Sequence, residues 1–216
     1  MMMRLGLALA ALMLLTVPAL PQASGDREAF LAGTTKDCPV CDLAGVRIKG
    51  RDLSGANLAG AEMMGADFSR ASLVNVNLSD TELFGANLSR ADATGASFAN
   101  AEMTGANLGT GVFVRASFRN AELHGARLTG GDFTRADFTG AELNRADIRN
   151  TDLSQARGLT QAQVSQACAN EGTRLPSGLT GSQCRGRIGT GGGVTVAIPR
   201  PPTPPRPPRP WTIAGQ

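Results

Sequence analysis

The chain has 216 residues, with 27 glycines, 12 prolines, one tryptophan, no tyrosine and one histidine. Aromatic residues make up 4% of the sequence, too few for a nucleic-acid surface built on base stacking. A single histidine excludes a multi-histidine metal site and most serine–histidine or cysteine–histidine catalysis. We therefore expect no cofactor, no metal ion, no nucleic-acid partner and no enzyme activity, unless an activity resides in the C-terminal tail.

The formal net charge of +3 is unevenly distributed. Residues 1–40 are neutral, whereas residues 41–155 carry 11 basic and 14 acidic groups. Residues 156–216 carry seven basic groups and one acidic group. The basic character thus belongs to a tail, and the central part is mildly acidic, which argues against a basic DNA-binding domain.

The first 23 residues resemble a secretory signal peptide. Arg4 is the only charged residue before Asp26, and the apolar run Leu5–Leu15 follows it. This run is too short for a bilayer-spanning helix, which needs about 20 residues. We expect cleavage after Ala19 or Ala23 and a periplasmic or secreted protein; the alternative is an uncleaved membrane anchor. Residues 24–40 then form an N-terminal lead-in and cap.

Residues 41–155 follow a period of five. Every fifth residue from Leu43 to Leu153 is large and apolar, except Ala93, and the residue two positions earlier is mostly alanine. The 115 residues divide into 23 such units without an insertion. Neither an α-helix nor a simple strand has this period. Two inward residues followed by a turn describe one short side of a polygonal coil that stacks on its neighbours.

A longer period of 20 residues gives the number of sides. Glutamate recurs immediately before the large residue at Glu62, Glu82, Glu102, Glu122 and Glu142. A second series, in the interior, consists of Leu58, Leu78, Phe98, Phe118 and Phe138. Because 20 residues contain four units of five, each coil is predicted to have four sides.

Several units resemble the pentapeptide-repeat family, whose motif is A(D/N)LxX. They include Ala-Asp-Phe-Ser-Arg at 66–70, Ala-Asn-Leu-Ser-Arg at 86–90 and Ala-Asp-Phe-Thr-Gly at 136–140. The resemblance implies an all-β fold, a right-handed quadrilateral parallel β-helix. Its 23 sides make about 5.75 coils, or a rod roughly 27 Å long at about 4.8 Å per coil.

The sequence after residue 155 breaks the period. Leu159–Ala169 is predicted to form a short helix with Thr160 as its N-cap, within a C-terminal cap over residues 156–186. Residues 187–216 are predicted to form a Gly/Pro-rich disordered tail. Its segment Pro199–Pro210 favours polyproline II, as a spacer or as an arm that contacts an acidic envelope surface.

Four cysteines allow three disulfide pairings. Extending the period backward places Cys38 and Cys41 inside the first coil, whereas Cys168 and Cys184 lie about 27 Å away at the other end. Since bridged Cα atoms lie within about 7 Å, only Cys38–Cys41 with Cys168–Cys184 fits. The alternatives for Cys38 and Cys41 are a redox pair or a metal site, although no following helix is predicted to lower a thiol pKa.

The glutamate series, with Met64 and Phe84 beside it on the outer surface, is the candidate partner face. It would suit a basic partner or divalent cations; the alternative is that duplication of one coil copied a tolerated exposed glutamate. The favoured function is a non-enzymatic exported binding or scaffold protein with an unknown protein partner, and paired rod ends would give a dimer. The resemblance also implies an alternative, a DNA mimic that binds gyrase and protects it from quinolones. The charge of −3 over the coils and the predicted export disfavour it.

Overall fold

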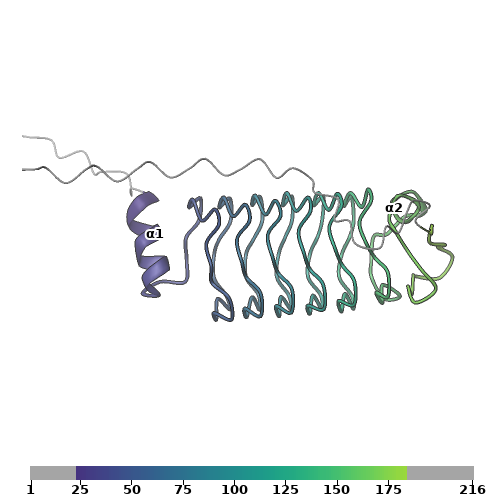
Figure 1. Ribbon diagram of the computed structural model, residues 1–216, viewed down its shortest axis with the longest axis horizontal. Coiled ribbons are helices and arrows are strands. Elements are labelled where there is room, and N and C mark those ends of the chain that lie inside the picture. Colours follow the sequence, from purple (N-terminus) through teal and green to yellow (C-terminus); the bar gives the residue numbers. More distant parts are fainter. Residues whose placement is uncertain (1–22, 184–216) are drawn as a thin grey trace, which may run out of the picture.

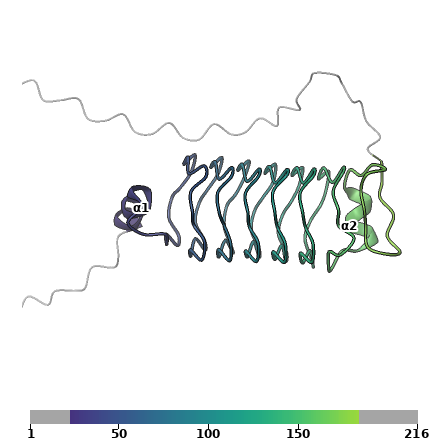
Figure 2. The ribbon, with the colours of Figure 1, turned by 90° about the horizontal axis from the view of Figure 1, so that it is seen from below.

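The computed structural model describes residues 23–183, which form a rod of stacked coils with a helix at each end (Figures 1 and 2). Helix α1 spans Ala23–Ala32, and helix α2 spans Gln161–Gln166. The expected signal peptide, apart from Ala23, and the expected tail at 187–216 lie outside the described residues. Neither described helix has the length and apolar character needed to cross a membrane.

Parallel bridges stack the coils with the predicted period. They join residue i to residue i+20 at the second position of each five-residue unit, from Asp42↔Glu62 to Asp137↔Arg157. Backbone hydrogen bonds flank each bridge: the N–H of Leu83 donates to the carbonyl of Glu102 (2.8 Å), and the N–H of Glu102 donates to that of Thr81 (2.9 Å). The 20-residue coil with four short sides is therefore confirmed. Within the described residues, each side contributes one bridged residue rather than a longer strand.

A tight turn separates successive sides. The N–H of Ala86 donates to the carbonyl of Leu83 (3.0 Å), and Gly85 between them has a φ of +62°. This left-handed conformation costs a residue other than glycine roughly 1–2 kcal/mol. Arginine nevertheless occupies five of these corners: Arg70, Arg90, Arg115, Arg135 and Arg145.

The predicted interior is also confirmed. All the large residues at the fifth positions from Leu43 to Leu153, and Ala93, are buried. Phenylalanine forms two columns in the later coils. Rings within a column are stacked, with centroids 5.0 Å apart, as for Phe98 and Phe118, and rings of different columns are tilted at 5.8–6.1 Å.

Gly111 and Gly131 stand at inward positions where most units carry alanine, and both have ordinary backbone conformations. A Cβ atom on Gly111 would lie 2.7 Å from Cε2 of Phe113 and 3.1 Å from the carbonyl oxygen of Ala91. The same distance, 2.7 Å, separates a Cβ on Gly131 from Cε2 of Phe133. These glycines are therefore explained by the space that the phenylalanine rings occupy.

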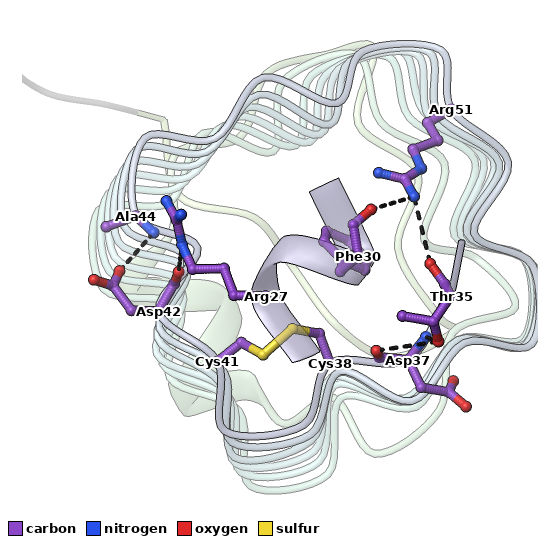
Figure 3. The surroundings of a disulfide bond; sticks show 9 residues. All are labelled: Arg27, Phe30, Thr35, Asp37, Cys38, Cys41, Asp42, Ala44 and Arg51. Atoms are coloured by element: carbon purple, nitrogen blue, oxygen red, sulfur yellow. Dashed lines mark hydrogen bonds between the residues drawn. A yellow bond between two sulfur atoms is a disulfide. The ribbon is translucent and has the colours of Figure 1, made fainter. Parts of the chain in front are cut away.

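Helix α1 covers the N-terminal end of the rod, as Figure 3 shows. It ends in a Schellman motif, in which Gly33 (φ +81°) donates to the carbonyl of Phe30 and Thr34 donates to that of Ala29. The Phe30 side chain is fully buried beneath the helix, and the Arg51 guanidinium lies 4.6 Å from its ring centroid. The sequence predicts a lead-in here, but it does not indicate this helix.

The C-terminal cap continues the ladder. Helix α2 lies within the predicted Leu159–Ala169 helix but is shorter, because the chain returns to an extended bridge between Asp147 and Cys168. Thr160 is the N-cap, as predicted, and forms a reciprocal capping box with Gln163. The Gln163 amide also donates to the carbonyl oxygen of Ala141 (2.7 Å), which ties the helix to the last complete coil.

Candidate functional site

The predicted glutamates lie in one column along the rod. Consecutive parallel bridges join Asp42 to Glu62 and then continue through each glutamate to Glu142. All six side chains are exposed. We call this side of the rod the acidic face, defined by Asp42, Glu62, Glu82, Glu102, Glu122 and Glu142.

Most of these carboxylates have no compensating charge in the described part of the chain. Only Glu142 forms an ion pair there, between its Oε2 atom and Nε2 of His124, 3.0 Å apart. Asp42 accepts a hydrogen bond from the backbone N–H of Ala44 (3.0 Å), which is internal to its own turn. Like charges aligned directly across neighbouring strands are destabilising, so the stability of the fold does not account for this column.

The column beside the glutamates contains Met64, Phe84 and His124. Met64 and Phe84 are half-buried rather than fully exposed, because the chain stacks other coils immediately above and below each of them. They therefore present less apolar surface than the sequence suggested. Among residues 23–183, no group of three or more histidine, cysteine or acidic side chains could hold a metal ion.

Two turns on other sides of the rod hold aspartates firmly ionised. The hydroxyl and backbone N–H of Ser69 donate to Asp67 and hold the pKa of its carboxyl below the usual value. The corresponding groups of Ser154 lower the pKa of Asp152 in the same way. These carboxylates are part of the turns and are not free to act as acids near neutral pH.

Cys38 and Cys41 form the predicted disulfide, with their Cα atoms 5.5 Å apart. Both are fully buried at the first coil, close to Phe30 in Figure 3. This burial supports a structural staple rather than a reactive redox pair. Cys168 is also disulfide-bonded, but its expected partner Cys184 lies outside the described residues.

Comparison with known proteins agrees with the coil geometry. The profile of the family described as "Pentapeptide repeats" matches eight copies over residues 41–80, 81–109 and 113–155. The chain therefore belongs to the pentapeptide-repeat family, whose solved structures are right-handed β-helices. A search of the curated proteins gives no match.

Three solved structures illustrate the similarity. A pentapeptide-repeat protein from the Arabidopsis thaliana thylakoid lumen is 31% identical, with 52% of this chain and 72% of that chain covered and a TM-score of 0.32. Rfr23 from the cyanobacterium Cyanothece is 15% identical, with coverages of 71% and 99% and a TM-score of 0.35. QnrB1, a plasmid-mediated fluoroquinolone resistance protein, is 18% identical, with coverages of 65% and 82% and a TM-score of 0.29.

Proposed function

We propose that this chain is an exported, non-enzymatic binding or scaffold protein, whose right-handed quadrilateral β-helix presents the acidic face to a basic protein partner. The observation that carries the proposal is the alignment of five glutamates on successive coils, four of them without an ion pair among the described residues. Complementary charge of this kind steers association and selects partners.

The rod suits such a role because its surface is rigid. Each coil is hydrogen-bonded to the coils on both sides, and its interior is filled by buried apolar side chains. A partner that meets the acidic face therefore meets charges whose spacing is fixed in advance, which lowers the ordering cost of binding. Export is supported by the N-terminal sequence and by the disulfide at Cys38 and Cys41, since disulfides form in oxidising compartments.

Matched charge variants test the acidic face. The immobilised protein is used to capture partners from an envelope extract, alongside Glu102→Gln/Glu122→Gln and a control, Asp92→Asn/Asp132→Asn. The control removes two charges from another side, where both aspartates accept hydrogen bonds from their own turns, which asparagine can also do. We expect the glutamate variant to lose a captured protein that the control retains. Equal capture by all three proteins would favour the alternative, in which duplication of one coil copied an exposed glutamate that has no role in binding.

Cell fractionation tests the export half of the proposal. We expect a processed chain outside the cytoplasm, with its N-terminus at residue 20 or 24. Recovery of an intact N-terminus in the cytoplasm would contradict export and reopen the gyrase-binding alternative.

A further inference from the structure

A basic groove runs along the side of the rod that follows the acidic face in each coil. It has a volume of about 460 Å³ and crosses five successive coils. Its floor consists of small residues, Ser69, Ser89 and Gly109, of which Ser69 and Gly109 are buried. A Cβ atom on Gly109 would lie 3.1 Å from Oδ1 of Asn107. The absence of a side chain at Gly109 therefore leaves the groove deeper at this coil.

Four cations line this groove: Lys49, Arg70, Arg90 and Arg127. All four side chains are exposed, and none forms an ion pair or a side-chain hydrogen bond with any described residue. One carboxylate, Asp67, also lines the groove, where it accepts hydrogen bonds from Ser69 and Asn87. The groove is therefore locally positive, although the coils as a whole carry a charge of −3.

Neutral hydrogen-bond donors lie between the cations. The Asn87 amide donates one N–H to Asp67 (3.1 Å), and the Asn107 amide donates one N–H to Asn87 (3.3 Å). Each amide has two N–H groups, so each retains one donor for a ligand. The Ser89 hydroxyl forms no side-chain hydrogen bond with the described residues. The groove thus offers positive charge together with free donors to an oxygen-rich anion.

The fold itself does not require arginine at Arg70 or Arg90. Both occupy left-handed corners, with φ of +62° and +60°. Three other coils fill the same corner with Gly50, Gly130 or Asn150, residue types that adopt this conformation more readily, and one fills it with Thr110 (φ +57°). Two adjacent coils therefore carry arginines without an ion pair on the same edge of one groove. Arginine also occupies left-handed corners elsewhere, at Arg115, Arg135 and Arg145, so the position of Arg70 and Arg90 along the groove, and not their backbone conformation, sets them apart.

We infer that this groove binds an anionic oligosaccharide, with its acidic groups on the arginines and its hydroxyls on Asn87, Asn107 and Ser89. The lining contains no aromatic side chain to stack on a nucleic-acid base. It also contains no large apolar side chain to form a pocket for a peptide anchor or a lipid chain. Amides, hydroxyls and cations in a long open channel instead match a linear, hydroxyl-rich polyanion. This inference is independent of the acidic face.

Calorimetry on the full chain tests the inference with defined probes. Tetragalacturonic acid supplies carboxylates, a heparin-derived tetrasaccharide supplies sulfates, and maltotetraose is the neutral comparison. We expect at least one anionic tetrasaccharide to bind, with an affinity that falls as salt is raised. Maltotetraose and inorganic sulfate are expected to bind at least tenfold more weakly, because neither offers spaced charges together with sugar hydroxyls.

The decisive comparison uses two variants that each remove two arginines one coil apart. Arg70→Asn/Arg90→Asn alters the groove, whereas Arg115→Asn/Arg135→Asn alters the equivalent corners of another edge, where the two arginines line a smaller pocket with Arg157 and Asp137. The control therefore asks whether the groove, and not any pocket lined by arginines, binds the probe. Each asparagine has a native precedent in its own column, at Asn150 and at Asn75 respectively. The basic tail is present in all three proteins, so the difference between the variants isolates the groove.

The groove variant is expected to weaken binding at least tenfold, and the control less than threefold. A third variant, Ser89→Tyr, keeps every charge but raises the floor, and we expect it to weaken binding to a similar degree while the protein stays folded by circular dichroism. Equal losses in the two arginine variants, absence of binding by the wild type at low salt, or equal binding of maltotetraose would each overturn the inference. Tighter binding of an acidic peptide of the same charge would overturn it in favour of a protein ligand.

Discussion

The two halves of the rod share a backbone but differ in their interiors. In the first half, the two interior columns contain leucines: Leu53, Leu58, Leu73 and Leu78. In the second half, the same columns contain Phe98, Phe113, Phe118, Phe133 and Phe138, whose rings stack at 5.0 Å within a column. The inter-coil hydrogen bonds are alike in both halves, for example 2.9 Å from Leu58 to Asn77 and 2.7 Å from Phe98 to Ser117.

The difference shows how the coil accommodates extra volume. Two positions before Phe113 and Phe133 the chain has a glycine, Gly111 and Gly131, whereas two positions before Phe118 it has Ala116. At Phe113 and Phe133 the larger ring is thus offset by a smaller residue at the other inward position of the same side, which preserves interior density there. The backbone that carries the outer columns is unchanged, which leaves the surface residues free to differ from coil to coil.

The largest expected effect is from Phe118→Ala, in the middle of the aromatic half. The Phe118 ring stacks on Phe98 and Phe138, with centroids 5.0 Å away on each side, and is tilted against two further rings. We expect the free energy of unfolding to fall by about 3–5 kcal/mol in urea denaturation followed by circular dichroism. The matched Leu58→Ala in the aliphatic half is expected to cost about 2–4 kcal/mol. A Phe118 variant less affected than the Leu58 variant would remove the distinction between the halves.

A smaller effect is expected from Gly111→Ala, which restores the usual residue of the repeat. The added Cβ atom would lie 2.7 Å from the Phe113 ring and 3.1 Å from the backbone of Ala91, so the core must shift. We expect a loss of about 1–3 kcal/mol, measured in the same way. The converse variant Ala116→Gly controls for the residue exchange and should cost about 0.5–1 kcal/mol. An unchanged or raised stability of Gly111→Ala would show that the ring does not occupy this space.

Removal of the helix cap next to the aromatic half should have a milder effect. Thr160→Ala deletes the side chain that accepts the backbone N–H of Gln163 at the start of α2. Loss of such an N-cap costs about 1 kcal/mol. We expect a correspondingly lower thermal midpoint, while Thr160→Ser should remain close to the wild type. Equal midpoints for the alanine and serine variants would contradict this role of the cap.

The smallest expected effect is a loss of folding stability at acidic pH, and it should be similar in the two halves of the rod. Hydrogen bonds from Ser69 and Ser154 lower the pKa of Asp67 in the first half and of Asp152 in the second. Their stabilisation is present above the unfolded-state pKa of about 3.9 and is lost as the pH falls through the lower folded-state values. Unfolding followed between pH 5 and pH 2 should show this loss, and Asp67→Asn/Asp152→Asn should make it shallower. An equally steep loss in the double variant would assign the acid sensitivity to other groups.

The period of the sequence was sufficient to predict the interior. Leu83 and Phe118 each stand at the same position of a five-residue side, and the side chain at that position points toward the axis of the coil. The stacking of Glu62 on Glu82 followed from the 20-residue period for the same reason. Helix α1 was missed, because it lies outside the repeats and its one core residue, Phe30, has no periodic partner. The basic groove was missed as well. Arg70 and Arg127 are 57 positions apart in the sequence, and only the stacking of coils, with the small floor residue Gly109 between them, brings them to one channel.

The central claim is that one 20-residue coil is the structural unit, and deletions test it most directly. Removal of residues 81–100 takes out one whole coil and leaves every later column in place. A deletion of residues 81–98 removes two residues fewer than a whole coil, and it moves Met103 from the interior to a corner. Circular dichroism with thermal unfolding should show a folded, cooperative protein for the 20-residue deletion and loss of the cooperative transition for the 18-residue deletion. Equal stability of the two proteins, or an unfolded 20-residue deletion, would contradict the claim.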